Sequence, residues 1–121
     1  IVLFHGVRQL SDLAYEELIT QTLPQNEFFG DAVREKLIYY PSVTREPFRN
    51  QGRLTDLIES GKLCAEGGLP PLNPEHDRAM ICGSSHMLQD TSELLNKRGF
   101  QISPRIGEPG QYVIERAFVE K

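Results

Sequence analysis

Apolar residues fall alternately into short continuous runs and into stretches with helical spacing. Ile1–Phe4 is an apolar run closed by His5-Gly6, as expected of a buried strand. Around and after Ser11-Asp12, apolar residues recur every three or four positions, which predicts an amphipathic helix. Its apolar positions are Leu10, Leu13, Ala14 and Leu18.

The same alternation continues through the middle of the chain. A short helix is expected around residues 32–36, and residues 37–43 are rich in aromatic and β-branched residues that favour a strand. Pro41 places that strand at a sheet edge or on a bulge, because proline has no N–H to donate. Helical spacing returns from Leu54 and ends at Gly61, whereas residues 64–77, CAEGGLPPLNPEHD, have the composition of a loop.

The last third repeats the strand-helix order. Ala79–Cys82 reads as a short buried strand, and Gly83-Ser84-Ser85 leads into a helix that should stop at Gly99. Its inward positions are Met87, Leu88, Thr91, Leu94 and Leu95. After the turn GEPGQY, Tyr112–Val119 is an apolar strand. Buried strands alternating with amphipathic helices indicate an α/β fold with a parallel sheet, and we expect residues 1–121 to form one domain.

Composition narrows the choice of partners. The chain has 121 residues and a formal net charge of -4, which argues against nucleic acid as a general partner. It has no apolar run long enough to cross a bilayer and no secretory signal pattern, so no membrane partner and a cytoplasmic location are expected. Its two cysteines, Cys64 and Cys82, are far apart and form no C-x-x-C pair.

Parallel sheets bind ligands beyond the carboxyl ends of their strands. Three segments follow predicted strands here, namely His5–Arg8, Thr44-Arg45 and Cys82–Ser84, and we expect them on one rim. Arg45, Arg49 and Arg53 follow one another at four-residue intervals in the stretch VTREPFRNQGRL.

These arginines are candidates for binding a phosphate monoester, with Arg49 the most dispensable. Guanidinium groups match phosphate oxygens, and Gly52 permits a close backbone approach. The alternative is that they are solvated or pair with acids such as Glu46 and Glu59. The 2′-phosphate of an adenosine ribose is the usual phosphate at this part of a dinucleotide fold. No G-x-G-x-x-G occurs in the chain, so the pyrophosphate loop is of another kind or lies upstream of Ile1.

Other candidate chemistry is weaker. Ser84, Ser85, His86 and Asp90 contain the atoms of a hydrolase triad, but the G-x-S-x-G elbow is absent and neighbouring residues do not easily reach one another. The histidines have no metal-ligand spacing, so no metal site is expected. From the residues alone, Cys82 is either an active-site thiol or a core residue, and the core reading is favoured.

Four segments together resemble the NADP-binding half of bacterial ferredoxin/flavodoxin–NADP reductases over nearly the whole chain. They are HGVR, VTREP followed by GRL, DRAMICGSSHML and the ending YVIERAFVEK. The resemblance implies a Rossmann-like sheet with flanking helices, and a flavoprotein that passes electrons between NADPH and ferredoxin or flavodoxin through FAD. It also implies a largely monomeric parent whose FAD-binding barrel precedes this part.

Matching positions carry over the family's expected roles. Near the 2′-phosphate and adenosine the resemblance places Arg8, Thr44, Arg45 and Arg53, with Asp77 on the same half of the nucleotide. Cys82 and Gly83 are expected where the nicotinamide meets the flavin, and Glu115, Ala117 and Phe118 along the flavin. Cys82 and Glu115 are thus the expected catalytic residues.

The family pattern also contains a strand and a Thr/Gly-rich pyrophosphate loop before the position of Ile1. The resemblance therefore implies that this chain lacks the first, central strand of the sheet and that loop, and we expect it to be inactive alone. Two other functions stay open. One is the reductase component of an oxygenase, which shares ICGS but is not expected to end in AFVEK. The other is a non-catalytic, phosphate-binding interaction module.

Overall fold

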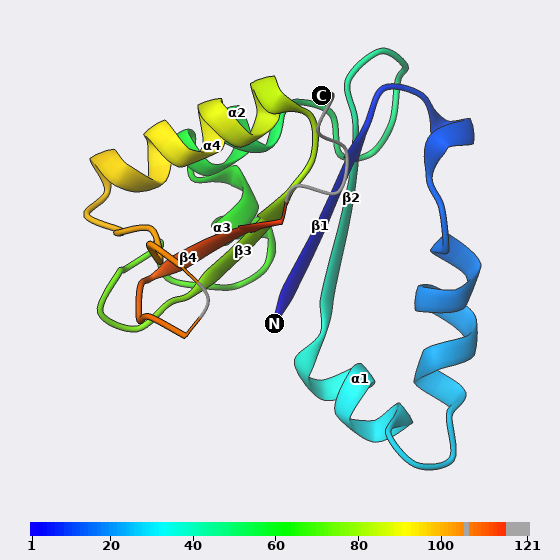
Figure 1. Cartoon of the computed structure of the whole chain (residues 1–121). Helices are drawn as coiled ribbons and strands as arrows, with labels where there is room; N and C mark the ends of the chain where they lie inside the picture. Colours follow the sequence, from blue (N-terminus) through cyan, green and yellow to red (C-terminus); the bar gives the residue numbers. More distant parts are fainter. Residues whose placement is uncertain (106, 116–121) are drawn as a thin grey trace. The chain divides into compact units, whose positions relative to one another are not determined.

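Two pairs of parallel strands organise the chain, one pair in each of two units (Figure 1). The computed structural model describes residues 1–105 and 107–115. The first unit is Ile1–Ser60 and the second Gly61–Lys121. Parallel strands with helices between them confirm the predicted α/β class.

The first unit is built on strands β1 (Val2–Val7) and β2 (Ile38–Val43). They pair in parallel from Val2 opposite Ile38 to Val7 opposite Val43. The predicted strand at Ile1–Phe4 was therefore right in place but too short. His5 and Gly6 remain extended because β2 supplies partners for them as far as Val43. Arg8 consequently follows the strand directly.

Pro41 lies in β2 without costing a ladder hydrogen bond. The amides of Ile38 and Thr44 both donate to the β1 side, so the even-numbered residues of β2 face β1. Pro41 is odd-numbered and faces away from β1, where its missing N–H leaves the ladder intact. The prediction of a strand at a sheet edge is confirmed, because β1 is the one strand that pairs with β2 in the described residues, where a single bridge also joins Val43 to Gln51.

The segment between β1 and β2 differs from its prediction. Instead of one amphipathic helix it contains three short helical pieces, η1 (Leu10–Asp12), η2 (Leu18–Thr22) and η3 (Leu23–Gln25). Tyr15 has φ 63, a left-handed conformation that an α-helix cannot contain. The predicted helix was wrong for this reason.

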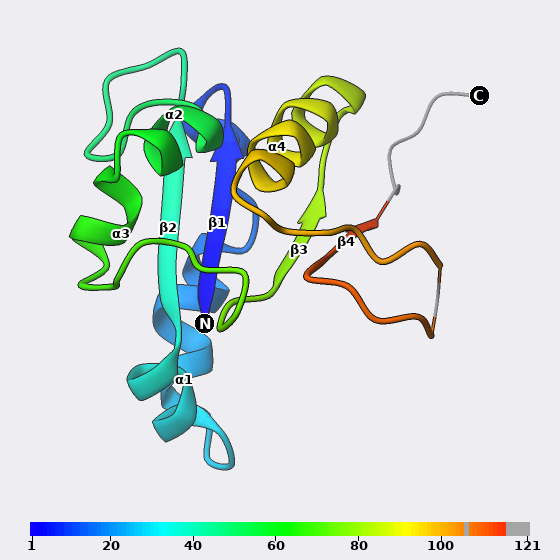
Figure 2. The same ribbon diagram turned by 90° about the vertical axis from the view of Figure 1, so that its left-hand side faces the viewer.

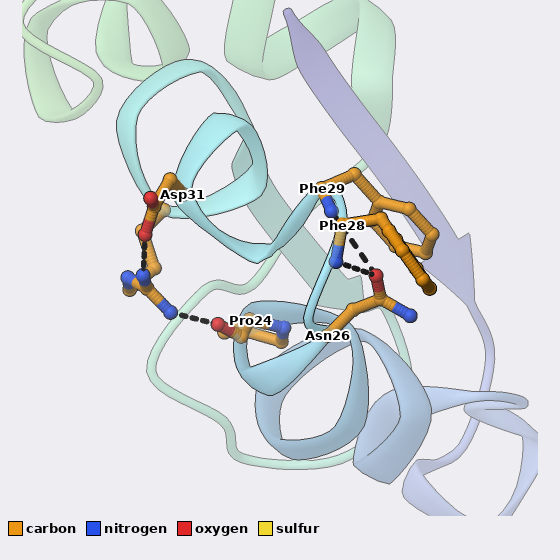
Figure 3. Close-up of polar contacts among 6 residues, drawn as sticks. Pro24, Asn26, Phe28, Phe29 and Asp31 are labelled. Carbon is orange, nitrogen blue, oxygen red and sulfur yellow. Dashed lines mark hydrogen bonds and ion pairs between the residues drawn. The ribbon is translucent and has the colours of Figure 1, made fainter.

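Helix α1 (Gly30–Lys36) confirms the short helix expected around residues 32–36. Figure 3 shows the turn before it, where Asn26 Oδ1 accepts hydrogen bonds from the amides of Phe28 at 2.8 Å and Phe29 at 3.0 Å. The Arg34 guanidinium donates to the Pro24 carbonyl and pairs with Asp31. The Asn26 side chain therefore stabilises the turn before α1.

Two helices follow the loop after β2. Helix α2 (Leu54–Glu59) buries Leu57 and Ile58, as the apolar spacing predicted. Gly61 has φ 78, which confirms its predicted role in ending that helix. Helix α3 (Lys62–Glu66) begins immediately afterwards, so the loop predicted from residue 64 was wrong over its first three residues.

The second unit pairs β3 (Ala79–Cys82) with β4 (Tyr112–Glu115) in parallel. Helix α4 (Ser85–Lys97) runs beside β3 (Figure 2). Its buried residues are Leu88, Thr91, Leu94 and Leu95. Gly99 has φ 88 and lies just after the helix, as predicted. The buried Tyr112 donates a hydrogen bond to Asn96 Oδ1 at 2.8 Å and so connects β4 to α4.

In the described residues, no ladder joins the β1–β2 pair to the β3–β4 pair. A central strand outside this chain therefore stays a prediction. The predicted last strand is present over residues 112–115, and its continuation to Val119 lies outside the described residues.

Candidate functional site

Arg8 and Arg45 lie next to each other at the carboxyl ends of β1 and β2. The Thr44 amide donates to the Val7 carbonyl and the Arg45 amide donates to the Arg8 carbonyl, both at 3.0 Å. Two consecutive amides thus bind two consecutive carbonyls, so the regular alternation of the ladder stops at Thr44. The structure therefore brings together three of the predicted site residues, Arg8, Thr44 and Arg45.

The loop from Thr44 to Gln51 closes back on the end of β2. The Val43 amide donates to the Asn50 carbonyl at 3.1 Å, and the Gly52 amide donates to the Val43 carbonyl at 3.3 Å. The Asn50 side-chain amide also donates to the Pro41 carbonyl at 2.9 Å. The loop's two ends are therefore held at one place.

A buried serine sets the position of Arg53. Ser42 is fully buried, and its hydroxyl donates to the Gly52 carbonyl at 2.6 Å. Gly52 has φ 132, a conformation that side chains rarely adopt, and Arg53 follows it as the residue before α2. The sequence analysis singled out Gly52 but missed Ser42, whose only signal was a small polar residue at an inward strand position.

Three arginines near the ends of β1 and β2 have no acidic partner among the described residues. Arg8, Arg45 and Arg53 are exposed, and none of them takes part in an ion pair with another described residue. Glu46, an expected competitor, instead accepts a hydrogen bond from the Leu10 amide at 2.6 Å. Pairing with Glu46 or Glu59 therefore does not neutralise these arginines among the described residues.

Arg49 differs from the other arginines of the loop. Its guanidinium carbon lies 4.6 Å from the centre of the Phe48 ring, a cation–π arrangement. The arginine that the sequence analysis considered most dispensable for phosphate binding therefore already interacts with an aromatic ring.

A second group of predicted residues lies at the carboxyl ends of β3 and β4. Cys82 and Glu115 are partners in the strand register, and both are exposed. Exposure overturns the core reading of Cys82. Gly83 follows immediately, and a Cβ atom there would lie 2.8 Å from the Met87 sulfur. The Met87 side chain thus lies against the backbone that follows Cys82.

The remaining motif residues near Cys82 have structural partners. Ser84 caps α4 by accepting a hydrogen bond from the Met87 amide at 3.3 Å. Its hydroxyl is therefore engaged in capping, which argues further against a hydrolase triad. No group of three metal-binding side chains occurs in residues 1–105 and 107–115.

Asp77 lies at the other end of β3 from Cys82. Its carboxylate accepts a hydrogen bond from the Asn73 amide at 2.8 Å, and its own amide donates to the Asn73 carbonyl at 2.8 Å. Four residues lie between it and Cys82, three of them in β3, which corresponds to about 16 Å at the usual rise of a strand. The structure does not bring these two residues together. Ala117 and Phe118 lie outside the described residues.

No helix in the described part of the chain is long and apolar enough to cross a membrane.

No protein-family model matches the chain. Known reductases, however, match it over its full length. It is 66% identical over 121 residues to a ferredoxin–NADP reductase of Azotobacter vinelandii, and equally so to one of Pseudomonas aeruginosa. Over its whole length the chain is similar to ferredoxin–NADP reductases.

The chain spans about half the length of these reductases, covering 47% of each of the two. A flavodoxin/ferredoxin–NADP reductase of Rhodobacter capsulatus is 38% identical over 119 residues. The relatives' names favour the ferredoxin–NADP reductase prediction over the oxygenase component.

The fold has a solved counterpart. A crystal structure of a ferredoxin NADP+ reductase from Neisseria gonorrhoeae, with bound FAD and NADP, matches 97% of this chain and 44% of its own with a TM-score of 0.77. At 24% identity this likeness concerns the fold alone. It supports the predicted Rossmann-like arrangement of parallel strands and flanking helices.

Proposed function

We propose that this chain is the NADP-binding part of a flavin-dependent reductase that transfers electrons between NADPH and ferredoxin or flavodoxin. The observation that carries the proposal is the backbone pairing of Arg8 with Arg45 at the ends of parallel strands. Both guanidinium groups are exposed and free of described acidic partners. In a chain of net charge -4, two exposed arginines joined through their backbones would form a local anion site.

The phosphate to be bound is the 2′-phosphate of NADP. Arg8, Arg45 and Arg53 would donate to its oxygens, because a guanidinium fork matches phosphate geometry. Thr44, whose amide donates to the Val7 carbonyl, would add its hydroxyl as a neutral donor. NADH has no 2′-phosphate, so this rim would distinguish the two nucleotides.

The reacting end of the nucleotide belongs to the second cluster. FAD, when bound by the parent, would supply the hydride chemistry, accepting a hydride from the nicotinamide. Cys82 and Gly83 would set the approach of the nicotinamide with a small thiol and a bare backbone. Glu115, the register partner of Cys82, has a carboxyl group that we assign to holding charge or a proton next to the reacting rings. Ala117 and Phe118 would complete the flavin contact.

The test is Arg45→Ala in the full-length parent. Loss of a charge-assisted hydrogen bond is worth roughly 1.5–3 kcal/mol, so NADPH affinity should fall about ten- to a hundredfold. Affinity for NADH should change little. Equal losses for both nucleotides would defeat the assignment.

A visible spectrum of the same protein completes the test. Flavin absorption bands are expected from a reductase, and their absence would favour the phosphate-binding module. A monomeric parent in the cytoplasm, with no nucleic-acid partner, belongs to the same proposal.

A further inference from the structure

Glu46 connects the two strand ends that carry the arginines. Its carboxylate Oε2 accepts a hydrogen bond from the Leu10 amide at 2.6 Å, across 36 positions of sequence. Leu10 begins the single turn η1, and Gln9 before it provides no side-chain cap. The first amide of this turn therefore finds its acceptor on the other strand's loop instead of in its own segment.

This contact is the third in a row between the same two segments. The amides of Thr44 and Arg45 donate to the carbonyls of Val7 and Arg8, and Glu46 then reaches Leu10. Arg8 makes the second of these contacts, Val7 before it makes the first, and Leu10 two residues later makes the third. The Arg8 backbone is thus held on both sides, although the strand has already ended at Val7. Without the third contact, the chain after Arg8 would lose its link to the loop.

The same contact decides what the Glu46 charge does. Glu46 is the residue after Arg45 and is half-buried. A carboxylate released from Leu10 would be close enough along the chain to pair with a neighbouring guanidinium and compete with a phosphate. A carboxylate that accepts a hydrogen bond from a backbone amide is held at that amide instead of pairing with a guanidinium group. Its placement keeps Arg8 and Arg45 available.

We propose that Glu46 is a positioning residue for recognition of the 2′-phosphate, holding Arg8 against Arg45 through the Leu10 amide. This inference rests on the proposed function and adds a residue that does not itself touch the ligand. It also gives two neighbouring charged residues different roles. Arg45 would bind the phosphate, and Glu46 would position the arginines that bind it.

Two substitutions in the full-length parent separate geometry from charge. Glu46→Ala removes the acceptor, whereas Glu46→Gln keeps an oxygen that accepts from Leu10 and removes the charge. Isothermal titration with adenosine 2′-monophosphate should give about tenfold weaker binding for Glu46→Ala and a change of at most about threefold for Glu46→Gln. The NADPH-to-NADH preference should fall for Glu46→Ala and be preserved for Glu46→Gln.

Hydrogen exchange of the Leu10 amide gives a second readout that needs no nucleotide. It should be faster in Glu46→Ala and near the parent rate in Glu46→Gln. Unchanged exchange in Glu46→Ala would overturn the inference. So would equal losses for NADPH and NADH, which indicate general damage to the fold.

Arg45→Ala, measured beside these variants, distinguishes the two failures. If Arg45→Ala leaves the nucleotide preference unchanged, the proposed function itself is wrong. If Arg45→Ala lowers the preference and Glu46→Ala does not, then only the role given to Glu46 is wrong.

Discussion

Cys82 and Glu115 are register partners at the carboxyl ends of the parallel strands β3 and β4. Neighbouring strands lie about 4.8 Å apart, and register partners project from the same face of a sheet. Both residues are exposed, so a thiol and a carboxyl group face the same surroundings. They form the smallest unit of the proposed hydride-transfer site.

We predict that Cys82→Ala in the full-length parent slows flavin reduction by NADPH roughly tenfold or more, because small displacements of the reacting ring are costly. Binding of adenosine 2′-monophosphate should be nearly unchanged, since that phosphate is bound by other residues. Stopped-flow absorbance measures the rate. Cys64→Ala is the matched control, because Cys64 is the other free cysteine and lies in α3. A parent-like rate for Cys82→Ala would mean that the thiol has no part in placing the nicotinamide.

Arg53→Ala should weaken NADPH about ten- to a hundredfold while leaving NADH nearly unaffected. Arg49→Ala serves as its control. Arg49 stacks on Phe48, whereas Arg53 lies directly after the anchored Gly52. Steady-state Michaelis constants for both nucleotides check the prediction. An Arg49 effect as large as that of Arg53 would contradict the separation of the two.

Ser42→Ala should lower the free energy of unfolding by about 1–3 kcal/mol, because the Gly52 carbonyl loses its buried donor. Urea denaturation measures the change. The exposed Ser85 at the start of α4 is the control, and Ser85→Ala should stay within about 0.5 kcal/mol of the parent. Equal effects at the two serines would remove the special role of Ser42.

Tyr39 should ionise at higher pH than a free tyrosine. Burial raises its pKa above 10.0, nearby Glu16 raises it further, and Arg49 lowers it. A raised pKa in the folded state means that the folded protein holds the proton more tightly than the unfolded chain. The resulting stability is present below pH 10 and is lost as the pH rises through the folded pKa.

Tyr39→Phe tests this directly. The Tyr39 hydroxyl is buried without a hydrogen-bond partner in the described structure, so its removal should leave neutral-pH stability unchanged or slightly higher. The loss of stability above pH 10 should become smaller. Urea denaturation from pH 8 to 11 measures it, with the exposed Tyr15→Phe as control. A steeper alkaline loss in Tyr39→Phe would contradict the shift.

The polypeptide of residues 1–121, made alone, should self-associate and bind no stoichiometric FAD. In the described residues β1 and β3 each pair on one side only, and Ile1 and Met80 are 85% and 79% exposed. Unpaired apolar strand edges recruit other chains. Sedimentation velocity and a flavin titration measure the outcome, and restoring the parent's upstream segment should give a monomer. A monomeric, flavin-binding polypeptide would contradict the prediction.

The sequence by itself determined the elements whose signals are local. Residues 38–43 are dense in strand-forming side chains, and residues 79–82 form a short apolar run. The helix at 85–97 has its cap at Ser84 and its stop at Gly99. Pro41 marked an edge because it has no amide proton, a property of the residue itself. The order of these elements was sufficient for the α/β class.

Local signals misled where the backbone departs from its pattern. The spacing after Leu10 looks helical, yet Tyr15 in the left-handed region divides the segment. The short helix α3 lay in a stretch whose glycines and prolines indicated a loop. Helix propensity and loop composition are therefore weak guides in both places.

Only the tertiary structure decided which distant groups meet. The sequence offered Glu46 as a partner for the arginines, and the fold pairs it with Leu10, 36 positions away. It likewise pairs Ser42 with Gly52 and sets Cys82 opposite Glu115. A hydrogen bond forms only when the distance between its donor and acceptor is right to within a few tenths of an ångström. Strand register sets that distance between two segments, and the order of residues alone does not.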